Sequence, residues 1–334
     1  MRKQITTSIL LFTIGLTTSC AVNPVSGKKD FVLMSNEQEI QLGNSLHKQT
    51  LKKQKPYNNP ALQAYVNNIG QQLARHSHRN NIRYTFTVID EPSINAFALP
   101  GGFIYITTGL MAYLNSEAQL AGVLGHEIGH VTARHSARQH SRATATSIIA
   151  SLITNKVGNA QLINTLSVAS IRGFGRKHEL QADRLGAEYL ARVGYRPENM
   201  IQVVGILKAQ EDFAKFLAKS EGKQPPSYHG TFSTHPSNDQ RLKEVILAAR
   251  RFPSAGSRPD NARSYLNYMQ GLNYRINKKQ MGRLKIITAR SGTTYAALAR
   301  KSKMPKYAEQ KLRLLNGMFP TGEPRPGQLL KIVE

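Results

Sequence analysis

Apolar residues in the first part of the chain recur every three or four positions. Between residues 60 and 76 they are Leu62, Tyr65, Val66, Ile69 and Leu73. This spacing places them on one face of a helix and predicts that the helix packs against a core. Another helix is predicted to begin at Ser35, where a polar cap precedes two acidic residues.

The pattern then changes to alternation. Tyr84, Phe86 and Val88 are separated by polar residues, which is typical of a strand with one buried face. Residues 98–102 end in a proline and two glycines and predict a turn, and the apolar run 103–107 predicts a second strand. Long helical patterns follow without regular strand–helix alternation. The sequence therefore predicts an α+β domain over 37–250 that is mostly helical, with a small β-sheet.

Residues 284–334 carry a separate, shorter pattern. Strands are predicted at 284–288 and 325–333, and two helices between them, one at 295–303 and one ending near residue 315. This strand–helix–helix–strand order predicts a small second domain. Residues 251–283, which contain two prolines and a glycine in their first part, are predicted to be a linker with some helix.

The charge narrows the classes of partner. The chain has 45 Lys and Arg against 20 Asp and Glu, a formal net charge of +25. Such an excess of positive charge indicates that the protein acts beside an anionic surface, such as acidic lipid or an acidic wall polymer. The alternative is that the charges only make the surface basic and well solvated. No nucleic-acid-binding motif accompanies the charge, so no nucleic acid is expected as a partner. A single cysteine excludes a disulfide within the chain.

The first twenty residues have the pattern of a secretory signal. Arg2 and Lys3 precede an apolar run at 9–16, and small residues precede Cys20. The run is too short to span a membrane comfortably. The pattern predicts a signal peptide at 1–19.

The end of this signal resembles that of bacterial lipoproteins. The resemblance implies that Cys20 is lipidated and that residues 20–36 are a tether. Thr17 stands where such signals usually carry Leu, and an ordinary secretory signal is the alternative. Because Ala21 rather than Asp follows the cysteine, the predicted location is the periplasm, anchored to the outer membrane.

The sequence His-Glu-Ile-Gly-His at 126–130 carries the candidate chemistry. Ser116 and Gln119 predict a capping box at the start of its helix. On that helix His126 and His130 project from one face, one turn apart, which suits two ligands of a tetrahedral Zn²⁺. Glu127 lies beside them, placed as the general base that takes a proton from the attacking water. The motif predicts a metallopeptidase with one zinc per chain.

A third ligand is expected on a later helix, because His135 and His140 have the wrong spacing to share the metal on the same helix. Glu179 and Asp183 are four apart and share a helix face. We assign Glu179 as the third ligand and Asp183 as the acceptor that fixes the tautomer of a ligand histidine. His178 is the rival ligand.

These motifs, with Asn-Ala-Phe-Ala-Leu-Pro-Gly-Gly at 95–102 and Ser-Thr-His-Pro at 233–236, occur in the order seen in HtpX-like and CaaX-prenyl-protease-type zinc metallopeptidases, which are gluzincins. Over residues 20–250 the chain resembles the periplasmic BepA/LoiP-like lipoprotein branch. The resemblance implies a zincin-type fold, with His126, His130 and Glu179 as zinc ligands and Glu127 as the base. It also implies unfolded or misassembled envelope proteins as substrates and the outer-membrane assembly machinery as a partner. The helical repeats that follow the protease in the BepA type are missing, so its partner specificity does not carry over.

Residues 284–334 resemble a LysM module, with Asn-Gly at 316–317 and Pro-Gly-Gln at 326–328. The resemblance implies binding to glycans that contain N-acetylglucosamine, such as peptidoglycan. The usual Gly-Asp-Thr of such modules is Gly-Thr-Thr at 292–294 here, so a purely structural cap is the alternative.

Two segments are expected to bear on substrate access. The strand at 103–107 is predicted to present an edge to which an extended substrate adds through main-chain hydrogen bonds. Residues 142–172, rich in small and apolar side chains, are interpreted either as a lid over the active site or as a core helix.

His235 precedes Pro236 and therefore lies outside a regular helix. The resemblance implies that it can fill the fourth zinc position and keep the enzyme latent. It could instead donate to the oxyanion of the tetrahedral intermediate, or be an ordinary surface residue.

The sequence thus predicts a zinc-dependent endopeptidase of the bacterial cell envelope. Two other functions stay open. One is a peptidoglycan-binding lipoprotein with a chaperone-like or vestigial protease role, and the other is a zinc enzyme that cuts peptidoglycan itself.

Overall fold

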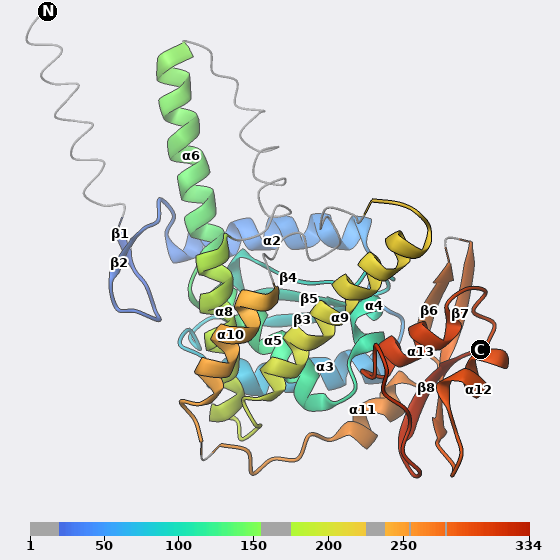
Figure 1. Ribbon diagram of the computed structural model, residues 1–334. Coiled ribbons are helices and arrows are strands. Elements are labelled where there is room, and N and C mark those ends of the chain that lie inside the picture. The colour runs from blue at the N-terminus through green and yellow to red at the C-terminus, as the bar shows by residue number, and fades with distance from the viewer. Residues whose placement is uncertain (1–19, 155–174, 225–237, 254, 278) are drawn as a thin grey trace, which may run out of the picture.

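The structure is a computed structural model that describes residues 20–154, 175–224, 238–253, 255–277 and 279–334 (Figure 1). The predictions for the signal peptide at 1–19, for His235 and for much of the segment 142–172 lie outside these residues. The α+β fold class is confirmed, because the described chain is mostly helical with two three-stranded sheets. None of the helices within the described ranges has the length and apolar character needed to cross a membrane.

The first sheet has the strand order β3 (Thr85–Ile89), β5 (Phe103–Thr107), β4 (Ala96–Leu99). Strand β5 is central, parallel to β3 and antiparallel to β4. The two predicted strands are confirmed, but the prediction that residues 103–107 present a free edge is wrong. Gly101 and Gly102 have φ values of 78° and 98°, which let the chain reverse through the short 3-10 helix η1 (Pro100–Gly102) and place β5 beside β4. Ala98 and Leu99, predicted to lie in the turn, end the edge strand.

Helices pack around this sheet (Figure 1). They are α2 (Asn36–Lys53), α3 (Pro60–Arg75), α4 (Thr108–Tyr113), α5 (Glu117–Thr132), α6 (His135–Thr154), α8 (Arg176–Arg192), α9 (Asn199–Ser220) and α10 (Asn238–Ala249). As predicted, Ser35 caps α2, in a reciprocal capping box with Gln38. Helix α3 buries its predicted apolar face, except that Tyr65 is only partly buried.

Helix α5 is buried along its whole length and lies against α8. The two helices approach closely because their facing residues are small. A Cβ atom on Gly129 would lie 3.0 Å from the carbonyl oxygen of Ala182, and one on Gly125 would lie 3.3 Å from that of Gly186. This close packing brings the acidic residues of α8 onto the face of α5 that carries the motif histidines.

The C-terminal part forms the second sheet. Helix α11 (Ala262–Met269) is followed by β6 (Asn273–Asn277), β7 (Gln280–Thr288), α12 (Tyr295–Arg300), α13 (Ala308–Leu315) and β8 (Leu329–Val333). The strands are antiparallel in the order β6-β7-β8. The predicted strand–helix–helix–strand order is present. Strand β6, which comes from the segment predicted as a linker, adds a third strand. We call residues 273–334 the C-terminal module.

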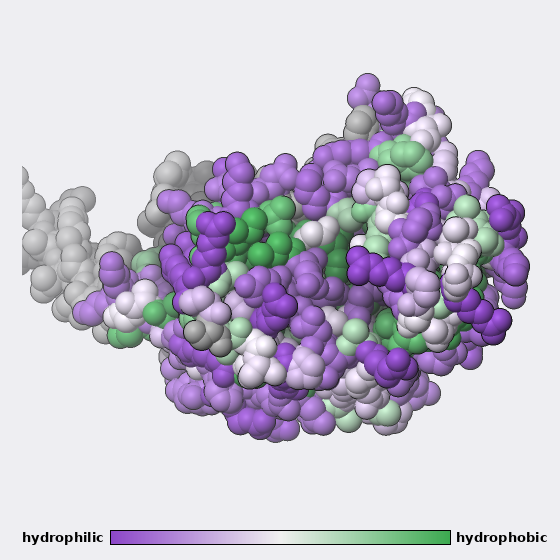
Figure 2. Space-filling view, turned by 60° about the horizontal axis from the view of Figure 1, so that its bottom comes forward, coloured by the Kyte–Doolittle hydropathy of each residue, from purple (hydrophilic) through white to green (hydrophobic). Residues whose placement is uncertain are grey.

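The core is continuous between the two parts. The larger of two clusters of buried apolar residues runs from Leu73 in α3 through Leu124 in α5 to Leu330 in β8. At the other end of the chain, residues of the predicted tether form a small hairpin of β1 (Cys20–Val22) and β2 (Lys29–Phe31). Figure 2 shows one face of the molecule, which is largely covered by hydrophilic residues.

Candidate metal centre

Helix α5 presents His126 and His130 on one face, as their spacing predicts. Ser116 caps this helix by accepting a hydrogen bond from the backbone N–H of Gln119 (3.2 Å). The side chain of Gln119 accepts from the N–H of Asn115 (2.6 Å) rather than from that of Ser116, so the second half of the predicted capping box is wrong. Both histidines are buried, and their Nε2 atoms lie 3.0 Å apart.

Glu179 of α8 completes the group. Its Oε2 lies 3.4 Å from Nε2 of His126, and its Oε1 lies 3.5 Å from Nε2 of His130. Ligands at about 2.0–2.1 Å from a tetrahedral zinc lie about 3.3–3.4 Å from one another. The two imidazole nitrogens and the two carboxylate oxygens of Glu179 therefore converge at separations close to those that one zinc ion requires. Two imidazole nitrogens and a carboxylate oxygen are also a ligand set of catalytic zinc.

Asp183, one turn along α8, orients the first ligand. Its Oδ1 lies 2.8 Å from Nδ1 of His126, and the guanidinium of Arg241 donates to both of its oxygens at 2.8 Å. Burial alone would raise the pKa of Asp183, but the charge and hydrogen bonds of Arg241 hold it well below its usual range. The ionised carboxylate accepts the Nδ1–H of His126, which leaves Nε2 as the metal-binding nitrogen.

The same groups make the site attractive to positive charge. Burial alone would lower the pKa of His126, but the hydrogen bond and charge of Asp183, with the contact to Glu179, raise it to about 9. At neutral pH the site therefore favours a cation, either a proton or a metal ion.

His135 orients the second ligand. Its Nδ1 lies 2.9 Å from Nδ1 of His130, and its Nε2 lies 3.1 Å from Oε1 of Gln181. Burial, reinforced by the nearby His178, lowers the pKa of His135 to about 3, so this ring is neutral. A proton on Nε2 of His135, donated to Gln181, leaves its Nδ1 to accept the Nδ1–H of His130. That arrangement leaves Nε2 of His130 as the metal-binding nitrogen.

His135 was excluded as a metal ligand on the assumption that one continuous helix carries it and His130. Helix α5 instead ends at Thr132, and Arg134 takes a left-handed φ of 53° before α6 begins. Glu39 holds this turn, accepting from Nε of Arg134 at 2.8 Å. The turn folds His135 back onto the second ligand.

His178, the rival ligand, and Arg241, the partner of Asp183, both lie close to the ligand group. The ring of His178 stacks on that of His135, with centroids 4.2 Å apart, and it is not one of the three converging ligands. Arg241, in α10, was missed entirely. A buried aspartate such as Asp183 needs a cationic partner, which could have indicated that an arginine lies nearby. The sequence alone does not say which arginine this is.

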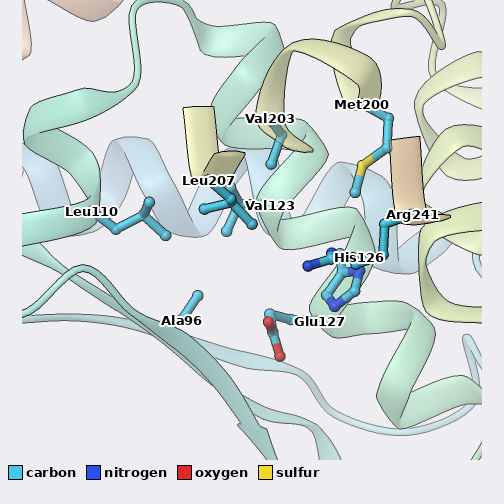
Figure 3. Close-up of a pocket in the computed structure, with 9 residues that line it drawn as sticks. All are labelled: Ala96, Leu110, Val123, His126, Glu127, Met200, Val203, Leu207 and Arg241. Atoms are coloured by element: carbon cyan, nitrogen blue, oxygen red, sulfur yellow. The ribbon is translucent and has the colours of Figure 1, made fainter. Parts of the chain in front are cut away.

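An apolar pocket adjoins His126 (Figure 3). Glu127 lines it together with Ala96 of the edge strand β4. Its apolar walls come from α4, α5 and α9 and consist of Leu110, Val123, Met200, Val203 and Leu207. The cavity measures about 20 Å³, room for about one water molecule. Glu127 thus lines a narrow apolar slot, beside the candidate zinc ligand His126.

Residues 60–247 match Peptidase family M48. The chain belongs to this family. A beta-barrel assembly-enhancing protease of Escherichia coli strain K12 is 30% identical over 261 residues, which are 73% of this chain and 51% of that protein. The mitochondrial metalloendopeptidase OMA1 of Arabidopsis thaliana is 35% identical over 173 residues, 52% of this chain and 33% of that protein. This M48 chain spans about half the length, or less, of these relatives.

The predicted metallopeptidase and its zinc cofactor are confirmed at the level of the family and the ligand set. The site of this M48 chain consists of His126, His130 and Glu179.

Replacing His135 by alanine is expected to weaken zinc binding by about 10- to 100-fold, because an orienting partner of a ligand is lost. Competition with a chelating dye measures this affinity. His140→Ala, on the same helix, is the matched control and should bind zinc as the wild type does. Wild-type affinity in His135→Ala would show that the contact between the two histidines does not orient the ligand.

Proposed function

We propose that this chain is a zinc-dependent endopeptidase of the bacterial cell envelope that hydrolyses unfolded or misassembled proteins. The observation that carries the proposal is the buried group of His126, His130 and Glu179, with Glu127 lining an apolar pocket beside His126. When bound, zinc supplies Lewis acidity, which polarises a peptide carbonyl and acidifies water.

Glu127 supplies the proton transfers. Its carboxylate takes a proton from the attacking water and later delivers it to the nitrogen of the leaving amine. The side chain is buried, with 3% of its surface exposed, and a buried, water-poor site favours proton transfer within the complex over exchange with bulk solvent. His126 and His130 keep their tautomers through Asp183 and His135, so the ligand geometry is in place before substrate binds.

The edge strand β4 is the proposed binding surface for the substrate backbone. In the part of the chain that the structure describes, β4 pairs with β5 on one side only. Ala96 at its start lines the pocket with Glu127. An extended peptide that adds to β4 would carry its scissile bond past Glu127 and place one side chain in the apolar slot. Because main-chain hydrogen bonds provide most of this recognition, unfolded chains of many sequences are suitable substrates.

The cellular setting rests on the sequence and on the names of the relatives. The lipoprotein-like signal that ends at Cys20 supports a periplasmic enzyme tethered to the outer membrane. The name of the Escherichia coli relative, a beta-barrel assembly-enhancing protease, supports envelope proteins as substrates and their assembly machinery as a partner. We further propose that residues 284–334, as a LysM-like module, bring the enzyme to peptidoglycan. In this setting the chain is an HtpX-like member of the BepA/LoiP-like branch.

A peptidoglycan-binding lipoprotein with a chaperone-like role is the second candidate function. The basic, LysM-like C-terminal module supports it. A complete ligand set with a base beside it does not favour this candidate, since a vestigial site has no need of those residues.

Incubation with four substrates tests the proposal. The purified chain is expected to cleave an unfolded β-barrel protein and casein, to leave a folded β-barrel intact, and to release no muropeptides from purified wall. The reason is that an extended backbone can add to β4 whereas a folded or glycan substrate cannot. Release of muropeptides without cleavage of unfolded protein would instead assign the site to wall hydrolysis.

A further inference from the structure

Lys331 is a buried lysine that does not belong to the metal centre. It lies in β8 of the C-terminal module and is fully buried. Its Nζ donates to the carbonyl oxygens of Ala112 and Leu114, each at 2.6 Å. Asn316 fixes the backbone of Lys331, accepting from its N–H at 2.8 Å and donating to its carbonyl at 2.9 Å.

The two acceptors lie at the C-terminal end of α4. Carbonyls in the last turn of a helix have no donor within the helix and need one from elsewhere. Burial lowers the pKa of Lys331 well below its usual range, which favours the neutral amine. A neutral amine has two N–H groups, and both are used here. Lys331 therefore reaches out of the module and caps a helix of the metallopeptidase domain.

Further contacts connect the module to the same region. The hydroxyls of Tyr274 in β6 and Tyr113 in α4 lie 3.1 Å apart. On α9, the ring of Phe213 meets Phe319 of the module edge-on, with centroids 5.6 Å apart. The module thus lies against α4 and α9, as Figure 1 also shows.

Both helices form walls of the slot beside Glu127. Leu110 comes from α4, whereas Met200, Val203 and Leu207 come from α9 (Figure 3). The slot is only about 20 Å³, so a bound side chain larger than a methyl group needs its walls to yield. The positions at which α4 and α9 are held therefore decide which side chains enter.

We propose that Lys331 is a positioning residue that holds α4 against the C-terminal module and thereby sets the side-chain preference of the slot. This inference rests on the proposed peptidase function. The module is then part of the specificity apparatus, and truncation at residue 284 would disturb the active site as well as any wall binding.

Lys331→Met preserves the length and apolar stem of the side chain but removes both donors. The carbonyls of Ala112 and Leu114 then lose this partner, and the end of α4 must shift to satisfy them. Lys285→Met is the matched control, because Lys285 lies on the neighbouring strand β7, is exposed and pairs with Glu334. Asn316→Ala is a second variant that keeps the Lys331 side chain but removes the two hydrogen bonds that fix its backbone.

The experiment measures kcat/KM for the full chain on peptides that differ in one residue beside the scissile bond, either Ala, Val, Leu or Phe. The ratio of kcat/KM for Leu to that for Ala is the readout. A loss of folded enzyme lowers all rates together and leaves this ratio unchanged. One methylene in an apolar pocket changes kcat/KM by about 10-fold or more, so we expect the ratio to shift by about threefold or more in Lys331→Met. Zinc content should equal that of the wild type, and Lys285→Met should keep the wild-type ratio.

An unchanged ratio in Lys331→Met, or an equal shift in Lys285→Met, would overturn the proposal. If Lys331→Met does not fold, Asn316→Ala decides, because it frees the backbone that aims the Lys331 side chain: a shifted ratio supports the proposal and a wild-type ratio overturns it. Failure of the wild type to cleave any of these peptides or casein would instead count against the proposed peptidase function itself.

Discussion

Glu127→Gln is expected to lose casein cleavage by at least about 100-fold while the bound zinc remains, because a positioned general base contributes about 10²–10⁴-fold to such a reaction. Glutamine keeps the size of the side chain and its place in the slot, but it cannot take the proton of the attacking water. Glu127 is not one of the three converging ligands, so the metal centre should stay intact. Parallel measurement of cleavage rate and zinc content separates the two effects.

Glu198→Gln is the matched control for this variant, since Glu198 is roughly half exposed and lies at the start of α9. It should cleave casein as the wild type does. Cleavage at the wild-type rate by Glu127→Gln would refute the role of Glu127 as the base. An inactive variant that still binds substrate would also serve to capture envelope proteins and identify them.

Glu179→Ala is expected to lose zinc after dialysis, with an affinity reduced by more than the roughly 10- to 100-fold that follows loss of an orienting partner. The reason is that only two of the three converging ligands remain. Zinc should then no longer raise the unfolding temperature of the variant, whereas it should raise that of the wild type. Metal analysis and thermal unfolding with and without zinc provide the two readouts.

His178→Ala distinguishes the two candidate third ligands. His178 precedes Glu179 directly and stacks on His135, outside the ligand group. We expect this variant to keep its zinc. The reverse pattern, in which His178→Ala loses zinc and Glu179→Ala keeps it, would overturn the ligand assignment.

The ligands could be predicted because their geometry is local. Two histidines four residues apart share a face of any straight helix, and the same holds for Glu179 and Asp183. The glycines that let α5 and α8 approach each other are also visible in the sequence, although only the structure shows which residues they face. Gly125 and Gly129 of α5 face small residues of α8 and allow the close approach that brings the ligands together.

Asp183 was predicted as an orienting residue, but His135 and Arg241 could not be, because long-range packing places them. His135 reaches the second ligand only because Arg134 breaks the helix with a left-handed turn, which is rare outside glycine. Arg241 lies 58 residues after the aspartate that it binds. The edge strand was misassigned for a related reason. Periodicity identifies strands, but the order β3-β5-β4 depends on how the chain turns at Gly101 and Gly102.

The small second domain was predicted from its strand–helix–helix–strand order, but its contact with the metallopeptidase domain was not predicted. A lysine in a predicted strand usually indicates a solvated face. Lys331 instead lies buried against carbonyls more than 200 residues earlier in the chain. No local pattern signals such a contact.

Removal and return of the metal test the central claim most directly. The full chain is treated with a strong chelator, dialysed, and assayed on casein before and after one equivalent of zinc is added. The account predicts that cleavage disappears with the metal and returns with zinc, and that Glu127→Gln stays inactive in both states. Cleavage that persists in metal-free wild-type protein would contradict the claim that this chain is a zinc-dependent peptidase.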